Sequence, residues 1–376
     1  MRHIPILLLL FVFSACSTTD DSEPIEEIVE EITPPIEEDP YFPPTSSNVW
    51  ETISTQELEW DTNALNDLYD FLSTNNTRAF IILKDGRIVV EQYWGTTINT
   101  NDAFDQSSVW YWASAGKSLT AFLVGLAQQE GLLDINDKTS DYLGTNWTSL
   151  TPEQEDRITI KHQLSMATGL DYTVADLDCT TPDCLLYRTD AGQQWYYHNA
   201  PYTLLGQVVS NAASTSYNNF TDTRIESQIG MSGTWLTNGE YNNVYWSTAR
   251  DAARFGLLML NEGTWENTTL MTDTDYFSSM LVSSQDFNPS YGYLWWLNGK
   301  DQIIPPSFPN PFPTSLAPNA PTDLYAAMGK NGQFINVVPS QDLVVVRMGE
   351  APDESLVPIT FHNELWSLLQ EVIAND

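Results

Sequence analysis

The sequence contains few cysteines, histidines and basic residues, and each shortage excludes a class of protein. Only 15 Lys and Arg stand against 50 Asp and Glu, and the net charge of −35 leaves no basic face for nucleic acid. With 4 His and no G-x-S-x-G motif, a Ser-His-Asp hydrolase is disfavoured. The chain has no internal repeat of solenoid length, and nothing in it indicates a metal or another cofactor.

The N-terminus has the pattern of an export signal. Arg2 precedes an apolar run, 4–13, of about ten residues, which is too short to span a bilayer and suits a signal peptide. The run ends in FSAC, which resembles a bacterial lipobox and implies cleavage before Cys16 and lipidation of its thiol. An ordinary signal peptide is the alternative. In both cases residues 1–15 are predicted to be removed and the protein exported to the bacterial cell envelope, with the membrane as a partner if Cys16 is lipidated.

Acidic residues and prolines dominate the next segment, 16–48, which after Cys16 contains no Lys or Arg. Such a composition cannot bury enough apolar surface to offset its ordering entropy, so the segment is predicted to be a disordered tether. The remaining chain, 49–376, is long enough for a large core and is predicted to be the functional domain.

Two cysteines, Cys179 and Cys184, lie close together in DCTTPDC. A disulfide across this turn is predicted, because an oxidising compartment permits it. Zinc is the alternative, but the spacing to His198, the nearest histidine, matches no zinc motif.

Hydrophobic patterns predict an α/β (α+β) fold. Residues 79–94 form two β-rich runs joined by Asp-Gly, a hairpin signal. We expect these strands and three near the C-terminus to join in one antiparallel sheet flanked by helices, with a mostly helical subdomain over roughly 115–250. The other predicted elements are helices at 118–133, 158–170, 199–213, 248–263 and 361–374, and strands at 324–329, 334–339 and 342–349.

The stretch WASAGKSLT, residues 112–120, allows two interpretations. A phosphate-binding P-loop requires glycine at position 111, where Tyr111 stands, and this excludes it. The other interpretation is S-x-x-K, with Ser114 and Lys117 on one face of a helix. The helix N-terminus assists a serine alkoxide, and apolar neighbours favour a neutral lysine. Taken alone, Ser114 also fits a simple helix N-cap.

Two further motifs follow in order. QQWYYHNAPYTLLG contains Tyr197 and Asn199, and MGKNGQFINVV contains Lys330 and Gly332. With S-x-x-K, the Y-x-N and K-x-G patterns resemble the serine β-lactamase and penicillin-binding-protein superfamily, closest to its class C β-lactamase-like branch. The resemblance covers most of 50–376 and implies a β-lactamase/DD-peptidase-like fold. The alternatives are an aromatic cluster for Tyr197 and a solvated turn for Lys330.

The resemblance implies a role for each residue of the first two motifs. Ser114 is the nucleophile, and Lys117 and Tyr197 share general-base and general-acid work. Asn199 orients Lys117 and the substrate amide. We expect cationic neighbours to lower the pKa of the Tyr197 phenol, as this role requires.

The third motif is expected to hold the substrate. Lys330 pairs with a substrate carboxylate, and Gly332 lets the substrate approach the strand. The backbone N–H groups of Ser114 and Gln333 form the oxyanion hole.

The resemblance implies a lipid-anchored serine hydrolase that forms an acyl-enzyme on an ester, amide, D-amino-acid peptide or β-lactam. The third motif reads K-N-G rather than K-T-G, and this departure disfavours efficient β-lactam hydrolysis. The alternative is a catalytically weak lipoprotein of the same fold that binds penicillin, peptidoglycan or another glycan.

Overall fold

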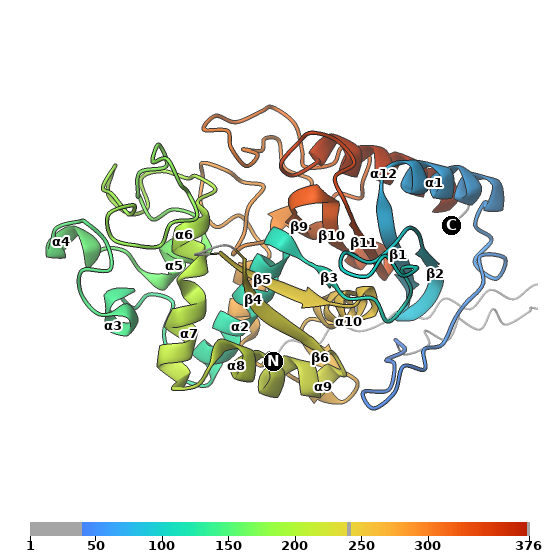
Figure 1. Ribbon diagram of the computed structural model, residues 1–376, viewed down its shortest axis with the longest axis horizontal. Coiled ribbons are helices and arrows are strands. Elements are labelled where there is room, and N and C mark those ends of the chain that lie inside the picture. Colours follow the sequence, from blue (N-terminus) through green and yellow to red (C-terminus); the bar gives the residue numbers. More distant parts are fainter. Residues whose placement is uncertain (1–39, 239–241, 374–376) are drawn as a thin grey trace, which may run out of the picture. The chain divides into compact units, whose positions relative to one another are not determined.

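The computed structural model describes residues 40–238 and 242–373 (Figure 1). The predicted signal peptide and Cys16 lie outside this part of the chain. Within the described ranges, no helix combines the length and hydropathy needed to cross a membrane.

The main sheet is antiparallel and has six strands in the order β2-β1-β11-β10-β9-β8. It joins the predicted hairpin to the predicted C-terminal strands, and so confirms the expected pairing of segments from both ends. The strands β9 to β11 are buried along their whole length, which explains their apolar sequences. Their bounds are β1 Thr77–Lys84, β2 Arg87–Tyr93, β8 Trp296–Leu297, β9 Tyr325–Gly329, β10 Gln333–Val338 and β11 Leu343–Gly349.

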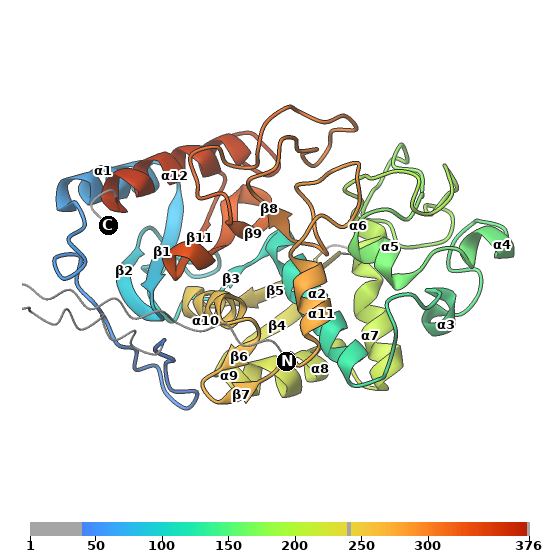
Figure 2. The ribbon, with the colours of Figure 1, turned by 180° about the vertical axis from the view of Figure 1, so that it is seen from behind.

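Helices cover both faces of this sheet (Figures 1 and 2). On one face α1 (Thr62–Thr74), which the sequence analysis did not predict, lies beside α12 (Ile359–Ile373), and Phe71 stacks on Phe361 at 5.1 Å between ring centroids. On the other face lies α10 (Ala249–Leu260). The helix α2 (Gly116–Gln129) runs from the sheet into the rest of the domain and is buried from Gly116 to Ala127.

The middle of the chain contains shorter helices than predicted. The predicted helix 158–170 is only α5, Ile160–Leu164, because Ser165 turns its hydroxyl back to the Lys161 carbonyl and Met166 has a positive φ of 57°. The predicted helix 199–213 is divided at Leu204. The helices of this region are α3 Ser140–Leu143, α4 Pro152–Glu155, α5, α6 Asn199–Thr203, α7 Leu205–Ala213, α8 Tyr217–Thr221 and α9 Ser227–Ile229.

A second, three-stranded sheet, which the sequence analysis did not predict, contributes two strands to the otherwise helical region 115–250. It has the order β3-β5-β4, with β3 at Trp110–Tyr111, β4 at Gly233–Asn238 and β5 at Asn242–Ser247. The sequence carried a signal for it, because Asn-Gly at 238–239 separates two runs rich in β-branched and aromatic residues. The remaining elements are β6 Thr264–Trp265, β7 Thr268–Thr269 and α11 Thr274–Met280.

The predicted tether extends too far, because residues 40–48 pack against the domain. The Arg254 guanidinium donates hydrogen bonds to the carbonyls of Pro43, Pro44 and Ser47 at 3.3, 3.0 and 3.3 Å. The backbone of this segment also joins the β1–β2 turn, where Tyr41 N donates to Asp85 O at 3.0 Å. A proline-rich composition therefore did not prevent order where a buried arginine donates hydrogen bonds to the backbone carbonyls.

The predicted disulfide is confirmed. Cys179 and Cys184 are bonded, with their Cα atoms 5.9 Å apart, in the loop between α5 and α6. Because both sulfurs are used in this bond, the zinc alternative falls away.

Candidate active site

Ser114 lies where β3 passes into α2, in a single 3₁₀ turn, Ala113–Ala115. Two hydrogen bonds fix Trp112, the residue before this turn. Trp112 N donates to Tyr245 O, and Trp112 Nε1 donates to Ser247 Oγ, both at 2.8 Å. Ala113 has a φ of 48°, a left-handed conformation that costs an L-residue about 1–2 kcal/mol. Such strain persists only where surrounding packing determines the backbone.

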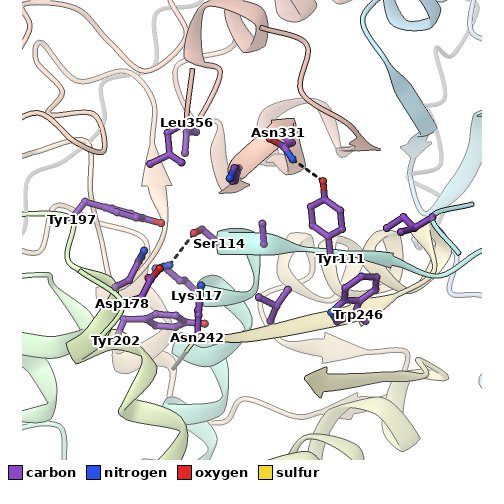
Figure 3. A pocket seen from close by; sticks show the side chains of 16 residues that line it. Tyr111, Ser114, Lys117, Asp178, Tyr197, Tyr202, Asn242, Trp246, Asn331 and Leu356 are labelled. Carbon is purple, nitrogen blue, oxygen red and sulfur yellow. Dashed lines mark hydrogen bonds between the residues drawn. The ribbon is translucent and has the colours of Figure 1, made fainter. Parts of the chain in front are cut away.

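Lys117 points back along α2 to Ser114, as the S-x-x-K spacing predicts. Its Nζ donates to Ser114 Oγ at 3.0 Å (Figure 3). The side chain is 2% exposed, and burial lowers the pKa of Lys117 to about 7, with the Asp178 carboxylate acting in the opposite direction. A substantial fraction of Lys117 is therefore neutral near pH 7 and able to accept a proton.

Tyr197 lies over Lys117, with the lysine Nζ 5.0 Å from the centroid of its ring. The ring stacks on Trp296 at 5.8 Å, and its hydroxyl is buried without a hydrogen-bond partner in the described part of the chain. Burial raises the pKa of Tyr197, an effect that the nearby Ser114 hydroxyl partly offsets. The expectation that cationic neighbours lower this pKa is wrong, because burial has the largest effect on it and nearby Tyr202 and Asp178 raise it further.

Asn199 and Lys330 also line the same cavity. The Asn199 Oδ1 atom is buried and has no hydrogen-bond partner among the described residues, so its predicted contact with Lys117 is not made. Lys330 begins the 3₁₀ turn η3, Lys330–Gly332, with an exposed side chain. It reaches the cavity from a turn rather than from a strand.

The structure does not bring Gly332 and Gln333 to the cavity. A Cβ on Gly332 would meet the Arg347 guanidinium at 2.6 Å, so this glycine serves internal packing. Gln333 is buried on β10, where its side chain bonds both backbone groups of Gly349. The predicted substrate approach at Gly332 and oxyanion donor at Gln333 are therefore corrected.

Gly329, at the end of β9, occupies the position expected for Gly332. A Cβ there would lie 2.5 Å from Trp112 O and 3.0 Å from Ser114 N. Gln333 is its partner in the β9–β10 register, but the contact with Ser114 N is made at Gly329, on β9. If Gly329 is the glycine of the K-x-G pattern, Ala327 stands at the basic position, and the strand Tyr325–Gly329 carries no basic side chain.

The cavity has a volume of about 450 Å³ and opens at Ser114 (Figure 3). Lys117, Asp178, Tyr197 and Tyr202 lie on one side of Ser114 in this view, while Tyr111 and Trp246 lie on the other. Asp178 contributes a negative charge, and its Oδ1 is buried without a partner among the described residues. The space suffices for a small organic substrate.

The sequence profile of the Beta-lactamase family matches residues 76–355. This chain belongs to the Beta-lactamase family. An uncharacterised protein of Alkalihalophilus pseudofirmus is 24% identical over 301 residues, which cover 72% of this chain and 82% of that protein.

Solved structures show the same fold. A putative 6-aminohexanoate-dimer hydrolase from Bacillus anthracis has a TM-score of 0.65 and 17% identity, and the match covers 90% of each chain. A class C beta-lactamase mutant has a TM-score of 0.62 and 14% identity, with 83% of this chain and 98% of that chain covered. The chain is thus similar in fold to a putative 6-aminohexanoate-dimer hydrolase and to a class C beta-lactamase.

For this member of the Beta-lactamase family, sequence analysis missed several residues of the cavity. Asp178 immediately precedes Cys179, and the sequence analysis considered it only as part of the cysteine motif. Gly329 stood in the quoted MGKNG, but Lys330 and Gly332 matched the expected pattern more directly. Nothing in the sequence indicated that Tyr111 and Trp246, on β3 and β5, would share the cavity with Ser114.

Proposed function

We propose that this protein is a serine hydrolase that forms an acyl-enzyme at Ser114 on an ester or linear amide without a carboxylate. The observation that carries the proposal is the 3.0 Å contact between Ser114 Oγ and Lys117 Nζ, with Lys117 buried and its pKa lowered to about 7. A buried lysine without a carboxylate in a salt bridge is costly to a fold unless the neutral amine is used.

The pKa of Lys117 is lowered and the pKa of Tyr197 is raised. These opposite shifts favour Lys117 as the base and Tyr197 as the acid. Neutral Lys117 takes the Ser114 proton as Oγ attacks the acyl carbon, and Tyr197, kept as a phenol, donates its proton to the leaving nitrogen or oxygen. The proton held by Lys117 then returns to Tyr197. In deacylation Lys117 accepts a proton from the attacking water, and Ser114 Oγ recovers a proton as it leaves.

The developing oxyanion is bound at the contact between Ser114 and the end of β9. The Ser114 N–H supplies one donor, since its nitrogen faces the open side of Gly329. A second donor comes from the backbone at the Gly329–Lys330 end of this strand. Donors of this kind act strongly because they are fixed before the reaction.

The charges of the cavity favour a substrate without a carboxylate. β9 offers no basic side chain beside Ser114, and Asp178 places a negative charge within the cavity. Lys330 is the cavity cation that remains for an anionic group of a substrate. It lies in an exposed turn, where water screens its charge. The fold similarity to a putative 6-aminohexanoate-dimer hydrolase is consistent with a linear amide.

We also propose that the protein is exported and held at the bacterial envelope through a lipid on Cys16. The apolar run with FSAC supports this, and the disulfide between Cys179 and Cys184 fits an oxidising compartment. In cells fed a radiolabelled fatty acid, the wild type should carry the label and Cys16→Ala should not. Equal labelling of both would refute the anchor.

Covalent labelling tests the proposed reaction. A fluorescent fluorophosphonate should add one probe mass to the intact protein, and peptide mapping should place it on Ser114. A folded protein that remains unlabelled, and that instead binds penicillin or peptidoglycan fragments reversibly, would replace this proposal with the binding lipoprotein.

Replacing Gly329 with alanine is expected to lower kcat/KM by about 10²-fold, the loss typical of one oxyanion-hole donor. The added methyl would press on Trp112 O and Ser114 N. The matched control is Gly131→Ala, because no atom lies within 4 Å of the added methyl there and only its positive φ is strained. Ester hydrolysis by both folded variants measures the difference, and equal rates would contradict the role of Gly329.

Replacing Asp178 with asparagine is expected to move the acid limb of the kcat/KM profile to lower pH. The Asp178 carboxylate raises the pKa of Lys117 against the larger effect of burial, so its removal lowers that pKa further. Neutral Lys117 would then persist at lower pH. A pH–rate profile of wild type and variant measures the shift, and an unmoved limb or a shift to higher pH would contradict it.

A further inference from the structure

The cavity is chemically divided at Ser114 (Figure 3). The side that holds Tyr197 also holds two charged residues, Lys117 and Asp178. The opposite side presents the rings of Tyr111 and Trp246. Apart from Tyr197 and Tyr202, the apolar and aromatic residues that line the cavity are Ile98, Tyr111, Ala113, Val244, Trp246, Leu356 and Val357.

The aromatic wall is held in place by its own contacts. The Tyr111 ring meets Trp246 edge-on at 5.6 Å and stacks on Trp110 at 5.2 Å. The Tyr111 hydroxyl accepts a hydrogen bond from Asn331 Nδ2 at 2.8 Å. This polar atom is thus satisfied by the protein, and the ring can face an apolar ligand.

Apolar surface also remains open at the rim. Ile98 and Leu356 both line the cavity, and they are 47% and 46% exposed. Two large aliphatic side chains left in water at the cavity gain free energy when a ligand covers them.

The position of the proton donor indicates which part of the substrate binds on the aromatic side of Ser114. Tyr197 must reach the leaving atom, so the leaving group lies on its side of Ser114. The acyl chain then extends to the other side. We propose that Tyr111 and Trp246 form an acyl subsite that selects aryl or branched alkyl acyl groups over small ones; this inference rests on the proposed hydrolase function.

Esters with one leaving group and different acyl groups test the subsite. Wild type should hydrolyse p-nitrophenyl phenylacetate with a kcat/KM at least about tenfold above that for p-nitrophenyl acetate, the range expected for added apolar contact in a pocket. Trp246→Ala should remove most of this preference and Trp246→Phe should restore much of it. Equal preference in wild type and Trp246→Ala would overturn the inference.

Binding to Ser114→Ala separates this inference from the proposed function. Ligand-observed NMR should detect phenylacetamide, but not acetamide, on this variant, and Trp246→Ala added to it should abolish the signal. If wild type hydrolyses esters while phenylacetamide binds no better than acetamide, the subsite is refuted and the hydrolase stands. If phenylacetamide binds but no ester is cleaved and no phosphonate is attached, the hydrolase and the acyl assignment both fail.

Discussion

Replacing Ser114 with alanine should lower kcat/KM for ester hydrolysis by about 10⁴-fold or more, since the loss of a covalent nucleophile leaves only binding and oxyanion stabilisation. Lys117 would lose the hydroxyl it now contacts at 3.0 Å and have no proton to accept. Steady-state hydrolysis of p-nitrophenyl esters measures the rate, and intact-mass analysis measures the acyl-enzyme.

Ser118 supplies the matched control, because it lies one helical turn further along α2. Its hydroxyl donates to Leu294 O at 2.8 Å, and it does not line the cavity. Ser118→Ala should lose about 1 kcal/mol of stability, the usual net value of one hydrogen bond, with unchanged turnover. Retained acyl-enzyme formation in Ser114→Ala, or an equal loss of activity in Ser118→Ala, would refute Ser114 as the nucleophile.

Replacing Lys117 with methionine should lower kcat/KM by about 10³-fold, the contribution expected of a well-placed general base. The same change should raise the melting temperature. Burial lowers the pKa of Lys117 from 10.5 to about 7, so the folded state disfavours a proton that the unfolded chain binds. Near pH 7 this difference lowers the free energy of unfolding by up to about 4 kcal/mol. Methionine does not titrate and would have no such cost.

The direction of this pKa shift predicts how the effect of Lys117→Met on stability changes with pH. Between pH 7 and about 10 the unfolded state holds a proton on Lys117 that the folded state lacks, so wild-type stability rises with pH through this window. The advantage of Lys117→Met in thermal unfolding should therefore shrink as pH increases. Lys138→Met, at a surface lysine paired with Asp156, is the control. Full activity in Lys117→Met, or a lower melting temperature at pH 7, would contradict this account.

Local spacing made part of the site predictable. Three residues along a helix necessarily place Ser114 and Lys117 on one face, and the apolar sequence after them indicated the burial that lowers the lysine pKa. The hairpin at 79–94 and the C-terminal strands were predictable for the same reason, because alternation and turn residues act within a few positions.

The contacts between distant segments were not predictable in detail. Lys330 and Gly332 matched the third motif by letter, yet the strand beside Ser114 ends at Gly329 and turns away before Gly332. Which glycine contacts Ser114 depends on where β9 ends and on which strand pairs with it. A one-residue change in strand register turns a side chain to the other face of the sheet.

The sequence alone determined the family and the pairing of Ser114 with Lys117, since both rest on the spacing of short motifs, and local patterns located the strands at both ends of the chain. Tertiary structure alone decided that β9 brings Gly329 to the serine, that Asp178 enters the cavity, and that Tyr111 and Trp246 form its apolar wall. The reason is physical: helix and strand periodicity are set by neighbouring residues, whereas burial and the resulting pKa values are set by segments far apart in the chain.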